Sequence, residues 1–295
     1  MVTPARTAEA YAYCQRLARA HYENFPVASR LLPRAMRPHV AAVYAFARRA
    51  DDFADEPGLD PADRLRLLDA WQMRLAALDS PAEQGTSEDD LVFVALSETA
   101  RSCGLPRSLF ADLLSAFRQD VMVKRYDTWT DVLDYCRRSA NPVGRLVLRI
   151  AGIADPVVDR QSDAVCTALQ LTNFWQDLGR DWSSGRLYVP RADLTAAGAR
   201  EEDLDARRLT PAWLDVMRVM SERTRELFET GKAVCDAVRG RLRWELRATW
   251  LGGMRILEKL ERGGFDVFTR RPALAAADLP ALAARAVLWT PARGR

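Results

Sequence analysis

Apolar residues recur at helical spacing along nearly the whole chain, and no segment shows the sustained alternation of apolar and polar residues that marks a strand. The pattern predicts a helix from Pro38 to about Glu56, because proline suits the first turn of a helix and Pro57-Gly58 ends it. One face of this helix carries Val40, Val43, Tyr44 and Ala47. The sequence therefore predicts an all-α protein.

Further helices follow at similar spacing. We expect them over about 90–103, 106–124, 129–152 with a break at Asn141-Pro142, 157–183, 211–240 and 241–262, where Gly263-Gly264 ends the last. The segments 80–90 and 183–193 are polar and read as loops. Because no repeat or flexible linker divides the chain, we expect a single domain over residues 1–295.

Two acidic clusters lie within these apolar helical stretches, at residues 51–56 (DDFADE) and 173–181 (NFWQDLGRD). Asp51 and Asp55 are four residues apart, and Asn173, Asp177 and Asp181 step by four, so each set projects from one side of its helix. A carboxylate in apolar surroundings needs a cation or a hydrogen bond. Convergent oxygen ligands suit Mg²⁺, which completes its shell with water and substrate phosphate.

Arginines accompany both clusters: Arg48 and Arg49 precede the first, and Arg180, Arg186 and Arg191 surround the second. Paired carboxylates with neighbouring arginines predict an enzyme that ionises an activated diphosphate, with Mg²⁺ neutralising the charge that develops on the leaving group. For the first cluster alone, a solvated helix end is an equally good interpretation. Aromatic residues such as Tyr135 and Phe174 could offer π faces to a carbocation, although core packing is the better interpretation for any one of them taken singly.

Composition excludes several other classes of protein. The five cysteines are scattered without CxxC spacing, which favours buried thiols over a disulfide framework or a zinc site. His21 and His39 are the only histidines, so a three-histidine metal site is impossible, and we expect both to be structural. No basic stripe interleaved with aromatic residues points to nucleic acid. The sequence lacks a signal peptide and a long apolar run, which predicts a cytoplasmic protein.

Four stretches together resemble the squalene/phytoene synthase family, in the family's order and over about residues 10–265. They are residues 24–33 (NFPVASRLLP), 42–56 (AVYAFARRADDFADE), 135–144 (YCRRSANPVG), and 173–181 followed by 185–190 (GRLYVP). The resemblance implies the all-helical isoprenoid synthase fold, a central cavity, a prenyl diphosphate substrate and Mg²⁺ bound by two aspartate-rich motifs that face across the cavity.

Family roles transfer to individual positions of this sequence. The resemblance implies metal binding by Asp51, Asp52, Asp55, Glu56, Asn173, Asp177 and Asp181. It also implies substrate contacts from Ser29, Tyr44, Arg48, Gln170 and Asn173, and a role in the chemistry for Tyr135. We add Gln176, Arg186, Tyr188 and Phe265 as candidate substrate-binding residues.

Two departures from the common family pattern indicate a subgroup. The usual motif arginine is replaced by neutral Gln176, and residues 140–144 (ANPVG) stand where Ala-Gly-x-Val-Gly is usual. Losing a cation beside one diphosphate suggests a site for one diphosphate rather than two. Together with residues 23–33 (ENFPVASRLLP), these departures resemble the bacterial hydroxysqualene synthases of hopanoid biosynthesis. We therefore expect conversion of presqualene diphosphate and water into hydroxysqualene and diphosphate, without NADPH.

Two alternatives remain open at this point. The chain could condense two prenyl diphosphates head to head, as presqualene diphosphate, squalene and phytoene synthases do, although that reaction favours arginine at position 176. A non-catalytic assembly factor is less consistent with the sequence, because all the motif carboxylates are present.

The expected substrate also suggests where the protein works. A thirty-carbon chain partitions into membrane, so we expect reversible contact with anionic bilayers, helped by Arg270, Arg271, Arg285, Arg293 and Arg295. Scattered, solvated arginines are at least as good an interpretation of these five residues. A sister presqualene diphosphate synthase is a further expected partner.

Overall fold

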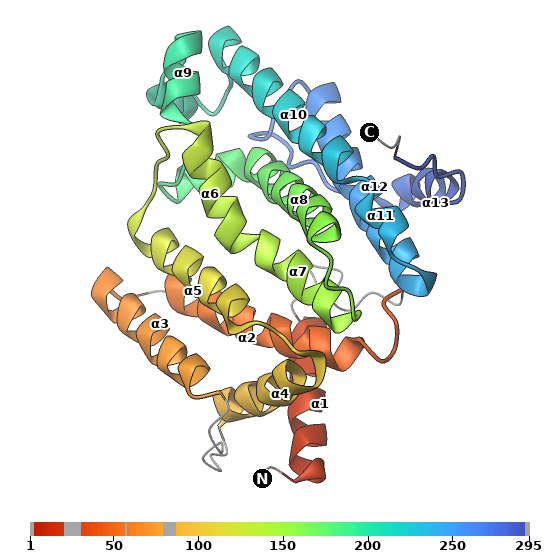
Figure 1. The fold of residues 1–295 in the computed structure, drawn as a ribbon. Helices are drawn as coiled ribbons and strands as arrows, with labels where there is room; N and C mark the ends of the chain where they lie inside the picture. The colour runs from red at the N-terminus through yellow and green to blue at the C-terminus, as the bar shows by residue number, and fades with distance from the viewer. Residues whose placement is uncertain (1–2, 21–30, 57, 79–86, 293–295) are drawn as a thin grey trace. The chain divides into compact units, whose positions relative to one another are not determined.

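The computed structural model describes residues 3–20, 31–56, 58–78 and 87–292 (Figure 1). Every regular element in these ranges is a helix, which confirms the all-α prediction. The chain forms two compact units: unit 1 comprises residues 1–122 and 142–155, and unit 2 comprises residues 123–141 and 156–295. Each unit is described by itself below, and the single domain stays a prediction.

Unit 1 contains helices α1 to α5 and most of α7. Their bounds are α1 Pro4–Ala20, α2 Arg37–Asp55, α3 Pro61–Ala76, α4 Glu88–Cys103, α5 Arg107–Met122 and α7 Asn141–Ile150. Helix α4 begins inside the predicted 80–90 loop because Ser87 and Asp90 form a capping box, which satisfies two backbone N–H groups at the helix start. Helix α1 was not among the predicted helices.

An aromatic cluster forms the core of unit 1. Phe46 of α2 is fully buried, and its ring packs against Trp71, Phe93 and Phe110 at centroid distances of 5.7, 6.0 and 5.3 Å. Phe46 therefore joins α2 to three other helices. Tyr44 is two residues earlier on α2, so it lies on the opposite side of that helix, which faces away from this core.

His39 serves a structural role in unit 1, as predicted. Its Nδ1 lies 3.1 Å from the hydroxyl oxygen of Tyr11 and 3.0 Å from that of Thr99, and the two hydroxyls are 2.9 Å apart. Burial lowers the pKa of the imidazole. His21 lies outside the described residues.

Unit 2 is organised around three long helices. These are α8 Pro156–Ser183, α10 Pro211–Gly231 and α12 Gly240–Arg262. The shorter elements are α6 Trp129–Ser139, α9 Arg191–Ala197, η2 Glu201–Ala206, α11 Val234–Ala237, η3 Ala276–Asp278 and α13 Leu279–Val287. The predicted break at Asn141-Pro142 is confirmed, since α6 ends at Ser139 and α7 begins at Asn141. The predicted helix over 211–240 is wrong in its last third, because α10 ends at Gly231 and α11 follows.

Helices pack closely at the end of α10. A Cβ atom added to Gly231 would lie 2.5 Å from the carbonyl oxygen of Gln161 and 2.6 Å from Cγ2 of Val165, both on α8. Gly253 of α12 is equally tight against the side chains of Leu169 and Phe228. Two glycines therefore allow α8 to pack closely against its neighbours, which Figure 1 shows running side by side.

The cysteines are all free thiols. Cys14, Cys136 and Cys235 are buried as predicted, whereas Cys103 and Cys166 are partly exposed. Burial raises the pKa of Cys14 and of Cys235 to about 12, so these thiols are held in the unreactive protonated form.

Candidate active site

The first acidic motif lies at the C-terminal end of α2, on the side of that helix that faces away from the core. Tyr44, Arg48, Asp51 and Asp52 are partly exposed, and Asp55 is exposed, although the residues between them include buried Ala50 and Ala54. The helical spacing of the sequence therefore presents the motif on one accessible stripe, as predicted.

Arg48 ties this stripe together. Its Nη2 lies 2.7 Å from Oδ1 of Asp52 and its Nη1 lies 3.7 Å from Oδ2 of Asp51. The Nε of Arg48 is buried and has no hydrogen-bond partner among the described residues. A buried N–H without a partner is costly, so this donor is suited to an incoming oxyanion.

Arg49 points elsewhere, although it adjoins Arg48 in the sequence. Its Nε donates to Oδ1 of Asp89 at 2.9 Å, and its guanidinium lies over the ring of Phe53. Arg49 therefore links α2 to the start of α4 rather than serving the acidic motif.

Tyr44 lies one turn before Arg48 on the same stripe. Burial raises the pKa of the Tyr44 hydroxyl, and the charges of Asp51 and Asp52 act in the same direction, against that of Arg48.

The second acidic motif forms a polar stripe on α8. One side of this long helix is buried and includes Leu171, Phe174 and Trp175. By contrast, Gln170, Asp177 and Asp181 are partly exposed and Asn173 is exposed. The predicted residues of this motif thus lie on one accessible face of α8.

Asp177 is bound by Arg271 in two places. The Nε of Arg271 lies 2.5 Å from Oδ1 of Asp177, and its Nη2 lies 2.8 Å from Oδ2. This is the bidentate fork that guanidinium groups form with carboxylates. Arg180, by comparison, reaches Asp177 only at 3.7 Å and is mostly exposed.

Arg271 belongs to a segment that crosses α8, which we call the strap (residues 268–273). The ring of Phe268 would lie 3.0 Å from a Cβ added to Gly179, and Gln176 Nε2 donates to the carbonyl oxygen of Pro272. Lys259 of α12 donates to the carbonyl oxygen of Ala273 at 2.8 Å. The strap therefore covers the part of α8 that carries Gln176, Asp177 and Gly179.

Sequence reasoning missed the strap. Arg271 was assigned only to the set of arginines expected to contact a bilayer, yet the structure ties it to Asp177. An arginine followed by proline shortly after the Gly263-Gly264 helix end was the available signal. That signal does not reveal which carboxylate the arginine binds, because the pairing spans 94 residues.

Four aromatic rings cluster beside the second motif. Tyr188 stacks on Phe174 with centroids 3.6 Å apart and an interplanar angle of 3°, and Tyr135 lies 6.0 Å from Phe174 and 5.9 Å from Tyr188. Tyr126, which the sequence analysis did not identify, stacks on Tyr188 at 5.6 Å. All four are buried. The structure therefore joins Tyr135 to Tyr188, which the sequence had indicated separately.

The remaining predicted residues have varied surroundings. The backbone N–H of Arg186 donates to the carbonyl oxygen of Asp181 at 2.8 Å, which fixes the turn after α8. Phe265 is buried and has a φ of 58°, a conformation that bulky residues rarely adopt. Arg191 lies 3.3 Å from Asp127 and 3.4 Å from Glu201, rather than at the acidic motif. Ser29 lies outside the described residues.

The donors of both motifs fit Mg²⁺ by their chemistry, since carboxylate and amide oxygens are hard ligands on accessible faces. Within the described residues, no group of three or more His, Cys, Asp and Glu side chains is already gathered as a metal site. The carboxylates of Asp52 and Asp177 contact arginines instead. Metal ligation by these motifs remains a prediction.

Comparisons with known proteins agree with this description. The profile described as Squalene/phytoene synthase matches residues 18–278. The chain belongs to the squalene/phytoene synthase family. Members of this family are enzymes that act on prenyl diphosphates. The fold is accordingly that of the isoprenoid synthases.

Individual members of the family match over most of the chain. A hydroxysqualene synthase of Rhodopseudomonas palustris is 38% identical over 74% of this chain and 72% of its own length. A phytoene synthase of Arthrospira platensis is 29% identical over 92% of this chain and 90% of its own. The crystal structure of the squalene synthase HpnC from Alicyclobacillus acidocaldarius is 42% identical, covers 90% of this chain and 97% of its own, and superposes with a TM-score of 0.81.

Proposed function

We propose that this protein is a hydroxysqualene synthase, a Mg²⁺-dependent lyase that converts presqualene diphosphate and water into hydroxysqualene and diphosphate. The similarity to a hydroxysqualene synthase at 38% identity carries this proposal, since the phytoene synthase is 29% identical. The neutral Gln176 in the second motif supports it. Glutamine carries no charge, so position 176 supplies no cation for a second diphosphate. The amide of Gln176 is buried and hydrogen-bonded to the strap.

Asp51 and Asp55 of the first motif and Asn173, Asp177 and Asp181 of the second are the proposed metal ligands, with Asp52 and Glu56 beside the first. When bound, Mg²⁺ neutralises diphosphate charge and acts as a Lewis acid. Arg48 supplies a further cationic contact, for which its buried Nε is available. These side chains therefore stabilise the negative charge that grows on the leaving group.

The proposed reaction is balanced with water as its only co-substrate. The carbon–oxygen bond to diphosphate breaks, and its electron pair leaves with the diphosphate. The cyclopropylcarbinyl cation rearranges, a water oxygen bonds to the resulting cation, and the released diphosphate accepts the proton. Tyr135 and the neighbouring rings provide π electron density in a dry setting, which stabilises a cation by about 2 kcal/mol per ring. Gln176, Asn141 and Tyr135 are candidates for positioning the water.

The structure bears on two of these candidates. Gln176 uses its amide N–H on the Pro272 carbonyl, and Asn141 Oδ1 accepts a hydrogen bond from the Thr167 hydroxyl at 2.9 Å. Each amide retains its other end for a water molecule. The substrate-binding roles of Ser29, Tyr44, Gln170, Arg186, Tyr188 and Phe265 form part of the same proposal, as do a presqualene diphosphate synthase as sister enzyme and peripheral contact with a bilayer.

A second candidate function is squalene synthesis, because the solved structure at 42% identity is that of a squalene synthase. The two functions differ in substrate and in reductant. Purified protein with Mg²⁺ and presqualene diphosphate, and without a nicotinamide, should release diphosphate and form a thirty-carbon alcohol. Farnesyl diphosphate alone should give little product. Squalene that forms only with NADPH, or efficient use of farnesyl diphosphate, would move the assignment to the second candidate or to a condensing enzyme.

The metal assignment is tested by single substitutions. Asp51→Asn and Asp177→Asn should each lower turnover by a factor on the order of 10² to 10³, the usual cost of removing one electrostatic stabiliser. Asp215→Asn is the matched control, because Asp215 is an exposed aspartate on α10 that also pairs with an arginine. Near-normal turnover of either motif variant in excess Mg²⁺ contradicts the metal assignment.

A further inference from the structure

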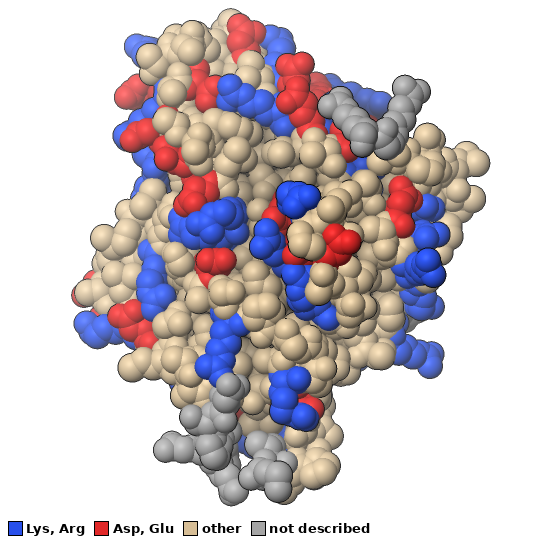
Figure 2. Space-filling view, in the orientation of Figure 1, with Lys and Arg blue, Asp and Glu red and all other residues tan. Residues whose placement is uncertain are grey.

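The outward face of α13 is apolar and exposed. Val287 and Leu288 are 70% and 78% exposed, and Leu279, Ala283 and Ala284 on the same helix are also exposed. Arg285 is the only charged residue from Leu279 to Trp289. In Figure 2 the outer edge of the surface at the place of α13 is tan, the colour of residues that are neither acidic nor basic. Exposed apolar surface gathered on one element marks an interaction site.

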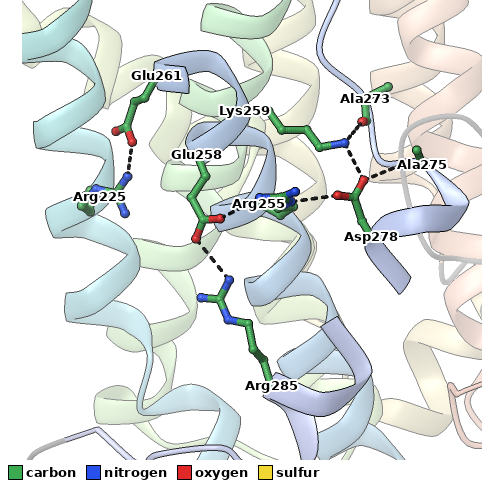
Figure 3. Close-up of polar contacts among 9 residues, drawn as sticks. All are labelled: Arg225, Arg255, Glu258, Lys259, Glu261, Ala273, Ala275, Asp278 and Arg285. Carbon is green, nitrogen blue, oxygen red and sulfur yellow. Dashed lines mark hydrogen bonds and ion pairs between the residues drawn. The ribbon is translucent and has the colours of Figure 1, made fainter. Parts of the chain in front are cut away.

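Polar contacts fix the opposite side of this helix to α12, as Figure 3 shows. Asp278, just before α13, accepts from Arg255 Nε at 2.8 Å and from Lys259, and its side chain is almost fully buried. Arg285 donates to Glu258 at 3.1 Å. These contacts hold the pKa of Asp278 well below its usual range. Since the charged groups at α13 are engaged inward, the helix is held in place with its apolar face outward.

A cationic and aromatic margin adjoins the C-terminal end of α13. The guanidinium of Arg247 pairs with Asp236 at 3.1 Å, so the accessible cationic groups of this margin lie earlier in the chain. The same guanidinium donates to the carbonyl oxygen of Ala286 at 3.3 Å and lies over the rings of Trp244 and Trp289. Trp244 is therefore next to α13, and it is exposed. Arg241, one turn earlier on α12, is exposed as well, and so is Arg239, the residue just before that helix.

We infer that α13, with Trp244 and the exposed arginines Arg239 and Arg241, is a docking surface for the interface of an anionic lipid bilayer. Charge complementarity selects this occupant, because an apolar helix face bordered by arginine and tryptophan suits acyl chains beneath anionic headgroups. Within the residues that the structure describes, no helix is long and apolar enough to cross a membrane. The contact is therefore interfacial.

This surface differs from the set of arginines predicted from the sequence. Of those five, Arg271 is tied to Asp177 and Arg285 to Glu258, while Arg293 and Arg295 lie outside the described residues. The inference rests on the proposed function only in that a thirty-carbon substrate gives the enzyme a reason to work at a bilayer. The lipid contact itself can be measured without substrate.

Vesicle flotation tests the inference with the full chain. Wild type should bind vesicles of phosphatidylglycerol and phosphatidylcholine at low salt, and bind pure phosphatidylcholine vesicles more weakly. Val287→Glu/Leu288→Glu should reduce binding by about tenfold or more, because it places two charges in the apolar face. Met73→Glu/Met122→Glu is the matched control, since these exposed residues, at 67% and 63%, lie in unit 1. It should bind as wild type does.

Two further variants separate the possible outcomes. Val287→Ser/Leu288→Ser removes apolar area without charge and should also weaken binding, which guards against a folding defect specific to the glutamates. Arg239→Gln/Arg241→Gln should flatten the dependence of binding on salt. Turnover of detergent-dispersed substrate by the glutamate variant should equal that of wild type, whichever product forms.

Three results would overturn the inference. Wild type that does not float at low salt has no lipid contact, and a glutamate variant that floats like wild type does not use α13. If wild type sediments as a dimer and the glutamate variant as a monomer, this face binds a second copy of the chain instead of lipid.

Discussion

Removing Arg271 should weaken the folded protein and strengthen its binding of metal. In the structure this guanidinium occupies both carboxylate oxygens of Asp177, at 2.5 and 2.8 Å. Arg271→Gln frees these oxygens, which are among the proposed Mg²⁺ ligands, and keeps a polar side chain of moderate length. The variant therefore separates the strap's arginine from the acidic motif without changing the motif.

The expected loss of stability follows from how exposed the Arg271–Asp177 ion pair is. Two unit charges at about 4 Å attract by about 4 kcal/mol at an effective dielectric constant of about 20. The side chains are 31% and 23% exposed, so solvent screening, desolvation and side-chain entropy offset most of this attraction. We expect a net loss of about 1 kcal/mol in the free energy of unfolding without metal. Since a metal ion no longer competes with the arginine, its affinity should rise by about fivefold, the equivalent of about 1 kcal/mol.

Calorimetry and Mn²⁺ electron paramagnetic resonance measure the affinity, and urea unfolding measures the stability. Arg270→Gln is the matched control, because Arg270 is the exposed neighbour in the strap, and it should change neither quantity. Repeating the titration with inorganic diphosphate shows whether Arg271 also contacts the anion. Unchanged or weaker binding of Mn²⁺ alone by Arg271→Gln would refute the competition between arginine and metal.

Three further predictions concern packing and titration. Gly231→Ala should lower the free energy of unfolding by about 3 kcal/mol, because the new Cβ meets the backbone of α8. Gly252→Ala should be nearly neutral, because its Cβ meets only one side-chain atom, at 3.4 Å. Equal losses of stability in urea unfolding would contradict this packing. Burial lowers the pKa of the His39 imidazole in the folded protein. As the pH falls, this imidazole is therefore protonated in the unfolded chain before it is protonated in the folded protein. Stability should therefore decline below about pH 6.5, and less steeply in His39→Gln; identical slopes of melting temperature against pH would exclude this role. Iodoacetamide should modify partly exposed Cys103 well before buried Cys136, whose pKa burial raises, as peptide mass spectrometry would show; equal rates would contradict that burial.

Local patterns in the sequence account for what could be predicted. Hydrophobic periodicity determined the long helices, and the four-residue steps of Asp51 and Asp55 and of Asn173, Asp177 and Asp181 correctly predicted an accessible stripe on each helix. The break at Asn141-Pro142 was predictable because proline is accepted in the first turn of a helix but not in its interior.

Long-range pairings account for what was missed. The close approach of Gly231 to α8 joins two separate helices, and the pairing of Arg271 with Asp177 depends on where the strap crosses α8. Helix α13 has only nine residues, too few for periodicity to distinguish it from a loop. No local pattern encodes such contacts, because they join residues far apart in the chain.

The identity of the oxygen in the product tests the central proposal most directly. Incubation with Mg²⁺ and presqualene diphosphate in ¹⁸O-labelled water, followed by mass spectrometry, reports whether water quenches the cation. The proposed hydroxysqualene synthase should yield a thirty-carbon alcohol that carries one ¹⁸O atom, without any nicotinamide. An alcohol without the label, or a hydrocarbon as the only product, would contradict it.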